Sequence, residues 1–158
     1  MQQPQFDLLL ERYANMVYRL AYSRTNSKAD NDDIMQEVFL RCLKRGPCIQ
    51  SKEHRKAWLI RTTINCSKNL LASAWFRRTA PLDEQLSCPK IQEDSVVEVV
   101  GRLPAKYRTV VHLFYYEDLS VTQIGTILGK KETTIKTWLH RARAMLREKL
   151  TERWINVP

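Results

Sequence analysis

The chain has 158 residues, of which 26 are lysine or arginine and 17 are aspartate or glutamate, giving a formal charge of +9 and a pI near 9.6. A hydrophobic fraction of 44% supplies enough apolar side chains for one domain or two small ones, which excludes a disordered basic tail. The first 20 residues carry four charges and no apolar core, so no secretory signal is expected. No segment approaches the roughly 18 uninterrupted apolar residues of a membrane span.

Cysteine and histidine residues show no metal or redox pattern. None of the cysteines forms a C-x-x-C pair, and no histidine has zinc spacing relative to them. The residues concerned are Cys42, Cys48, Cys66 and Cys88, and His54, His112 and His140. We therefore predict a cytoplasmic protein with reduced thiols, no metal, no cofactor and no membrane insertion.

Apolar residues recur at helical spacing over most of the chain, which predicts an all-α fold. Gly46 and Pro47 break the pattern, and a helix is expected over residues 52–74. Three apolar stripes are expected. The first is Phe6, Leu9, Leu10, Tyr13, Val17 and Leu20, and the third is Leu59, Thr63, Cys66 and Leu70. The second is Ile34, Val38 and Cys42, widened by Phe39 and Leu43, which each follow a stripe residue by one position. No strand pattern and no internal repeat stands out.

Residues 76–94 lose this periodicity and contain two prolines among scattered charges, which indicates a flexible linker. A linker of that length reaches roughly 60 Å when fully extended. Charge divides in the same way: 12 basic and seven acidic residues lie in 1–75, three and four in 76–94, and 11 and six in 95–158. We therefore predict two small helical domains, 1–75 and 95–158, each a basic block suited to a polyanion such as nucleic acid.

Residues 119–150 have the pattern of a helix-turn-helix. Ser120 and Gln123 have the spacing of a capping box at a helix start, and Gly129 follows as a left-handed stop. Gly125 costs roughly 1 kcal/mol inside a helix compared with alanine, which predicts a close crossing of the two helices there.

The second helix of this pair is expected to begin near residue 132. Its apolar stripe is Ile135, Leu139, Ala142, Leu146 and Leu150. The opposite face is basic or small and polar: Thr133, Lys136, Thr137, His140, Ala144 and Arg147. Such a face suits the major groove, because lysine and arginine bind phosphates and guanine edges while short side chains permit close approach. The alternative is an ordinary helical hairpin with a solvated basic face.

Three stretches together resemble the extracytoplasmic-function class of bacterial sigma factors. The first is DDIMQEVFL at residues 32–40, similar to the D-I-x-Q-E-x-F-L helix of that family. The second is KAWLIRTTIN at residues 56–65, similar to its K-A-W-L-x-R-I-A-x-N helix. The third runs from LP at 103–104, through LS at 119–120 and IG at 124–125, to IKTWLHRAR at 135–143. The resemblance implies two helical domains, sigma region 2 over 1–75 and sigma region 4 over 95–158.

The first stretch implies docking on the clamp helices of the largest subunit of RNA polymerase. The residues implied are Asp32, Asp33, Gln36 and Glu37. Offsets of 0, 3 and 4 put the last three on one helix face, and an acidic face in a basic protein suits a basic partner. The alternative from the residues alone is a solvated charged face.

The second stretch implies reading of the promoter −10 element as single strands. The residues are Trp58, Arg61, Asn65 and Lys68. A basic groove, an amide for a base edge and an aromatic ring for stacking suit unpaired DNA. The loop 46–51 would hold a flipped base, although it lacks the aromatic residue that many members have there. Trp58 alternatively belongs to the core.

The third stretch implies contacts to the −35 element. The residues that match the family's contact positions, or flank them, are Lys130, Lys131, Thr133, Lys136, Thr137, His140 and Arg141. Lys130 and Lys131 depart from the family's apolar and hydroxyl residues. Lys131 cannot cap a helix, so phosphate contact is the expected compensation. Trp138 often corresponds to arginine in the family, and we expect it to pack on the flank of the apolar stripe.

We therefore expect a sigma factor with no catalytic chemistry of its own. It would bind the clamp helices and the flap of core RNA polymerase, place that enzyme on promoter DNA and help to open the duplex, with an anti-sigma factor as its inhibitor. A stand-alone helix-turn-helix regulator that binds a palindrome as a dimer is the first alternative. A DNA-processing enzyme is the second, and no carboxylate cluster or nucleophile beside a base supports it.

Overall fold

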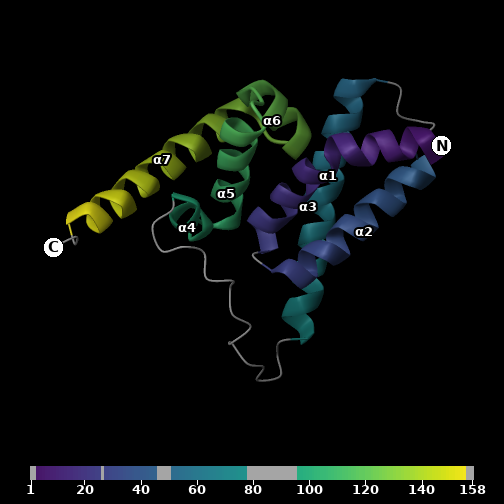
Figure 1. Ribbon diagram of the computed structural model, residues 1–158. Helices are drawn as coiled ribbons and strands as arrows, with labels where there is room; N and C mark the ends of the chain where they lie inside the picture. The colour runs from purple at the N-terminus through teal and green to yellow at the C-terminus, as the bar shows by residue number, and fades with distance from the viewer. Residues whose placement is uncertain (1–2, 26, 46–50, 78–95, 156–158) are drawn as a thin grey trace. The chain divides into compact units, whose positions relative to one another are not determined.

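The computed structural model describes residues 3–25, 27–45, 51–77 and 96–155. The chain divides into two compact units, Met1–Ser87 and Cys88–Pro158. All regular elements in the described ranges are helical, which confirms the predicted all-α fold (Figure 1). Within those ranges, no helix combines the length and the apolar character that crossing a bilayer requires.

The first unit is a bundle of three long helices. These are α1 (Gln3–Thr25), α2 (Lys28–Arg45) and α3 (Lys52–Arg77), and each packs against the other two. Its core contains Leu9, Val17, Leu20, Ile34, Val38, Leu59, Ile60 and Ile64, all nearly or fully buried. Burial of each such side chain stabilises the bundle by roughly 1.5–3 kcal/mol relative to exposure, so the helical stripes decide how the three helices face one another.

Serine residues cap α2 and α3. The amide of Asp30 donates to Ser27 Oγ at 3.3 Å, and the amide of His54 donates to Ser51 Oγ at 3.1 Å. Each bond satisfies an amide that has no partner within the first helical turn. Fully buried Asn31 ties α2 to α1, because its Nδ2 donates to the carbonyl oxygen of Tyr18 at 3.3 Å.

Two details of the first unit differ from expectation. Helix α3 continues to Arg77, so its last two residues lie in the segment predicted as linker. Leu43 was expected on the inner side of α2, one step round from the main stripe, yet it is 38% exposed. Phe39, which lies beside the main stripe as Leu43 does, is buried and meets the ring of Phe6 edge-on at 6.5 Å between centroids. The helices packed on α2 therefore cover Phe39 but leave Leu43, one helical turn farther along, partly exposed to solvent.

The second unit consists of shorter elements packed on one long helix. In order they are α4 (Val96–Gly101), α5 (Ala105–Val111), a π-helical turn η2 (His112–Tyr116), α6 (Val121–Leu128) and α7 (Glu132–Ile155). Helices α4, α5 and α6 all contact α7. One core cluster combines Leu103, Tyr107, Val111 and Ala142, and partly buried Val100, Trp138, Met145 and Leu146 pack against it.

No pattern in the sequence predicted the π-helical turn η2. It closes with an i to i+5 hydrogen bond, in which the amide of Glu117 donates to the carbonyl oxygen of His112 at 3.2 Å. The buried ring of His112 stacks on Tyr116 at 5.2 Å between centroids. Asp118 then takes a left-handed conformation with φ of 53°, and the chain turns into α6.

Candidate nucleic-acid interface

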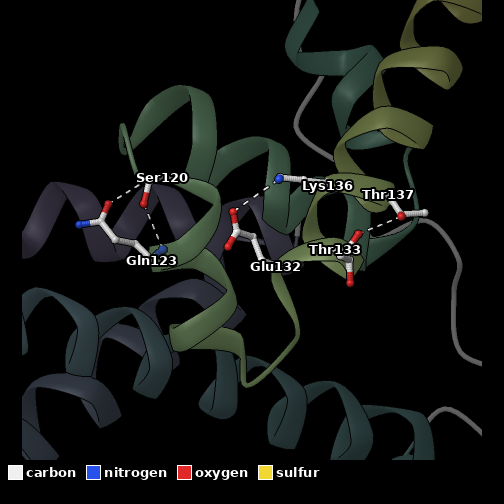
Figure 2. A network of polar contacts seen from close by, with 6 residues as sticks. All are labelled: Ser120, Gln123, Glu132, Thr133, Lys136 and Thr137. Carbon is white, nitrogen blue, oxygen red and sulfur yellow. Dashed lines mark hydrogen bonds and ion pairs between the residues drawn. The ribbon is translucent and has the colours of Figure 1, made fainter.

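The first helix of the predicted helix-turn-helix is α6, and it begins with the predicted capping box. Figure 2 shows the two reciprocal bonds: the amide of Gln123 donates to Ser120 Oγ at 3.1 Å, and the amide of Ser120 donates to Gln123 Oε1 at 2.9 Å. Ser120 has an extended conformation with φ of −72° and ψ of 159°, as a residue before a helix requires. The start of α6 is therefore fixed by local side chains.

The turn between α6 and α7 is a Schellman motif. Gly129 has φ of 66° and ψ of 35°, the left-handed conformation that was predicted. The amide of Lys130 donates to the carbonyl oxygen of Gly125 at 2.9 Å, and the amide of Gly129 donates to that of Thr126 at 3.4 Å. These bonds satisfy carbonyl groups at the end of α6 and set the direction in which α7 departs.

Gly125 makes a different close approach from the one expected. The prediction was a tight crossing of two helices, but the nearest atom to a Cβ at this position is the carbonyl oxygen of Lys130, at 2.8 Å. The amide nitrogen of Glu132 and Cγ1 of Ile135 lie farther away, at 3.7 and 3.8 Å. The glycine is therefore required mainly by the backbone of the turn.

The helix α7 divides into a buried stripe and an exposed face as predicted. Ile135, Leu139 and Ala142 are buried, whereas Leu146 and Leu150 at the end of the predicted stripe are only partly buried. The residues predicted to contact the −35 element are all exposed: Thr133, Lys136, Thr137, His140 and Arg141. Within this face, Thr137 Oγ1 donates to the carbonyl oxygen of Thr133 at 2.9 Å, and Lys136 Nζ lies 3.6 Å from Glu132 Oε1 (Figure 2). Such an exposed ion pair contributes little stability and leaves Lys136 able to exchange Glu132 for a phosphate.

Lys130 and Lys131, between α6 and α7, are both exposed and line an open hollow. Its volume is about 370 Å³, and its lining also includes Thr122, Thr126 and Glu132. The amide of Ile135 donates to the carbonyl oxygen of Lys131 at 3.2 Å, so Lys131 is the N-cap residue directly before α7. A cation at a helix N-terminus opposes the helix dipole, and a bound phosphate would relieve that repulsion.

Aromatic residues flank α7 in two ways. Trp138 packs partly buried against the core cluster, as expected, and Lys106 Nζ lies 5.6 Å from its ring centroid.

Arg143 was not among the residues predicted to contact DNA, although it is exposed on α7. Its Nε donates to the hydroxyl of Tyr115 at 2.8 Å, and the two residues are 28 positions apart. No local pattern in the sequence could indicate this contact, because it depends on how η2 packs beside α7.

The residues predicted to bind polymerase lie together on the outer side of α2. Asp32, Asp33, Gln36 and Glu37 are all exposed. Glu37 Oε1 accepts from Arg41 Nε at 2.7 Å, and this hydrogen bond raises the pKa of Arg41 above its ordinary value. An open hollow of about 320 Å³ between α2 and α3 is lined by Asp33, Glu37, Arg41 and Cys66, among others.

The residues predicted to read the −10 element lie along α3. Arg61, Asn65 and Lys68 are exposed, and their spacing places them on one face. Trp58 is partly buried at the edge of that face, which fits a ring that packs and still reaches the surface. The predicted base pocket, loop 46–51, lies outside the described residues except for Ser51, which caps α3.

Neither thiol in the described ranges forms a disulfide, since Cys42 and Cys66 are both free and buried. Burial raises the pKa of each thiol above its ordinary value, and nearby Arg55 and Arg41 oppose this change at Cys42 and Cys66 respectively. The described residues contain no cluster of histidine, cysteine, aspartate and glutamate side chains that could hold a metal ion.

Comparison with known families and proteins identifies both units. Residues 9–77 match the family described as Sigma-70 region 2, and residues 93–146 match Sigma-70, region 4. The chain is 32% identical over 150 residues to the ECF RNA polymerase sigma factor BldN of Streptomyces coelicolor, covering 87% of this chain and 57% of BldN. It is 28% identical over 142 residues to the RNA polymerase sigma factor SigV of Bacillus subtilis, covering 85% of this chain and 84% of SigV.

The chain belongs to the extracytoplasmic-function sigma factors of RNA polymerase. It also resembles the ECF sigma factor SigW of Bacillus subtilis, with 27% identity across 95% of this chain and 91% of SigW. This membership confirms the expected family, and it does not favour the stand-alone regulator. The chain nevertheless spans little more than half the length of BldN.

Solved structures show the same fold. The sigma factor RpoE of Bartonella quintana, crystallised with the anti-sigma factor NepR, superimposes with a TM-score of 0.78 at 19% identity, over 93% of this chain and 97% of that one. CnrH, in complex with the cytosolic domain of CnrY, gives a TM-score of 0.69 at 21% identity, over 96% of this chain and 90% of that one. At these identities the likeness concerns the helical architecture alone.

Proposed function

We propose that this chain is the promoter-recognising subunit of an RNA polymerase holoenzyme, and that its two units perform separate tasks. Residues 1–75 form the unit that binds core polymerase and the −10 element, residues 76–94 link the units, and residues 95–158 bind the −35 element. The chain supplies no catalytic group of its own. Since core polymerase works in the cytoplasm, the same proposal places the chain there.

Duplex binding is the task assigned to the second unit. The observation that carries it is the α6–α7 pair, in which a capping box and a Schellman turn hold an exposed basic face on α7. Lys136, Thr137, His140 and Arg141 are proposed to enter the major groove, where Arg141 is suited to a guanine edge. Lys130 and Lys131 are proposed to contact phosphates beside Thr133, because both lie at the N-terminal end of α7.

Polymerase binding is assigned to the exposed face of α2. Asp32, Asp33, Gln36 and Glu37 place carboxylate and amide groups side by side in a basic protein. Such a face is complementary to a basic surface on the clamp helices of the largest subunit, and charge complementarity speeds association and selects the partner. The flap of core polymerase is the contact proposed for the second unit.

Strand opening is assigned to the exposed face of α3. Arg61 and Lys68 supply positive charge for the backbone, and Asn65 between them supplies an amide that can hydrogen-bond a base edge. Trp58, at the edge of this face, is proposed to stack on an unpaired base. A base that leaves the duplex loses stacking and pairing, so contacts of this kind favour the open strands.

An anti-sigma factor is the proposed regulator. RpoE and CnrH, which share this fold, were each solved in complex with a second protein, described for RpoE as an anti-sigma factor. An inhibitor that covers the polymerase-binding face of α2 would prevent holoenzyme formation by direct competition.

The decisive experiment is transcription by purified bacterial core polymerase with and without this chain. Genomic fragments from the source bacterium serve as templates, and the 5′ ends of the transcripts are mapped. We expect new start sites that share two upstream elements at one fixed spacing. Tight binding to a palindrome in the absence of polymerase, with no new start site, would instead assign the chain to dimeric regulators.

A further inference from the structure

Arg143 is held in place by two aromatic residues of η2. Its guanidinium carbon lies 5.6 Å from the ring centroid of Phe114 and 5.8 Å from that of Tyr115. Its Nε donates a hydrogen bond to the Tyr115 hydroxyl at 2.8 Å. Both Arg143 and Tyr115 are nevertheless exposed, and Tyr115 has 52% of its surface in contact with solvent. The contacts thus fix the guanidinium at the surface instead of burying it.

This arrangement leaves the outer end of the guanidinium available. The Tyr115 hydroxyl occupies Nε, and the two terminal nitrogens have no hydrogen-bond partner among the described residues. Those nitrogens carry four N–H groups in a plane, a geometry that matches two oxygens of a phosphate. Because the aromatic contacts already restrict the side chain, less conformational entropy is lost when a ligand binds.

The position of Arg143 on α7 indicates which ligand it meets. It follows Lys136 by seven residues, which is two helical turns, so both lie along one edge of the exposed face. Thr133, Thr137 and His140 occupy the centre of that face. Side chains at the centre point into a groove, whereas Arg143, at the edge and two turns farther along α7 than Lys136, meets the sugar-phosphate backbone that borders the groove.

We propose that Arg143 binds a backbone phosphate of the duplex on which α7 docks, and that Tyr115 is the positioning residue that aims its guanidinium. This inference rests on the proposed binding of DNA by the second unit. It adds a phosphate site to that proposal. The site includes η2, which lies outside the helix-turn-helix, and its contact does not depend on base sequence.

The test uses the full chain and a 30-base-pair duplex of arbitrary sequence, since a phosphate contact needs no particular promoter. Fluorescence anisotropy at several salt concentrations gives both the affinity and its salt dependence. We expect Arg143→Ala to weaken binding on the order of threefold to tenfold at low salt and to reduce the slope of log K against log salt by about 0.9, as the loss of one phosphate contact requires. Tyr115→Phe should change both quantities in the same direction but less, and should have no effect when Arg143 is already alanine.

Two variants control this measurement. Tyr116→Phe removes the hydroxyl of a neighbouring exposed tyrosine whose ring stacks on His112 instead of Arg143, and it should bind as wild type. Arg12→Ala removes one positive charge from an exposed position of the first unit, and it measures the effect of net charge alone. Circular dichroism shows whether each variant keeps its helix content.

The outcomes separate this inference from the proposed function. A folded Arg143→Ala chain with the salt slope of wild type would overturn the phosphate contact, and so would a wild-type chain that binds no duplex at 50 mM salt. Tyr115→Phe with full binding would reject its positioning role. If the Arg143 and Tyr115 variants bound DNA normally but bound core polymerase weakly, these two residues would form a protein contact instead. Transcription by the wild-type holoenzyme would still support the sigma-factor proposal in each of these cases.

Discussion

The carbonyl oxygen of Lys130 lies where a Cβ atom at position 125 would approach it to 2.8 Å, and Gly125 is therefore the residue that lets the turn fold back on α6. The amide of the same lysine donates to the carbonyl oxygen of Gly125 at 2.9 Å. Both partners are backbone groups, so neither can move aside as a flexible side chain would. The geometry of the helix-turn-helix thus depends on the absence of one methyl group.

Gly125→Ala should consequently destabilise the second unit. Overpacking costs about 1–3 kcal/mol, which exceeds the gain of up to about 1 kcal/mol from the better helix propensity of alanine. Chemical denaturation followed by circular dichroism measures the change. Gly101→Ala is the matched control, because a Cβ there meets no atom within 4 Å, and it should be neutral or slightly stabilising. Equal stability of the two variants would contradict the steric argument.

Ser120→Ala should also weaken the second unit, by about 1 kcal/mol, since it removes the acceptor for the amide of Gln123. Gln123→Ala removes the reciprocal bond to the amide of Ser120 and should cost less. Because the two bonds belong to one capping box, the double variant should lose less than the sum of the single losses. Thermal unfolding of the three variants measures this coupling, and strictly additive losses would show that the bonds act independently.

Local signals account for what the sequence predicted well. The start of α6, the left-handed glycine and the buried stripe of α7 each depend on residues a few positions apart, and all three are confirmed. The features that were missed depend on distant contacts. The π-helical turn η2 and the pairing of Arg143 with Tyr115 follow from packing between elements, and the exposure of Leu43 depends on how far the neighbouring helices reach. Periodicity alone records which residues share a face, not how much of that face is covered.

The two buried thiols predict a specific pH dependence of stability. Burial raises the pKa of Cys42 and of Cys66, so the folded chain holds these protons more tightly than the unfolded chain does. Their contribution is complete below the pKa of the unfolded thiols, about 8.5, and it is lost as pH rises from there through the higher folded pKa. We expect the free energy of unfolding to decrease over this alkaline range under reducing conditions. A variant with Cys42→Ala and Cys66→Ala should show a smaller decrease, and an unchanged pH profile would contradict this assignment.

The docking face of α2 can be tested by charge reversal. Gln36→Ala combined with Glu37→Lys should weaken retention on immobilised core polymerase, because it replaces an acidic and amide surface with a basic one. Glu37 is paired with Arg41 at 2.7 Å, so Arg41→Ala frees the carboxylate and should not weaken binding. Glu11→Lys is the matched control, since it reverses an exposed charge on α1. Full retention of the folded double variant would remove the polymerase-binding assignment.

Asn65→Ala should impair promoter opening while leaving duplex binding nearly intact. Asn65 is exposed on α3 of the first unit, whereas the proposed duplex contacts are on α7 of the second. Once transcript mapping has identified a promoter, permanganate reactivity of its thymines reports the open strands, and protection of the upstream element reports duplex binding. Asn15→Ala, which removes an exposed amide from α1, should open the promoter as wild type does. If Asn65→Ala opened it equally well, Asn65 would have no role in holding single strands, and the exposed face of α3 would need another partner.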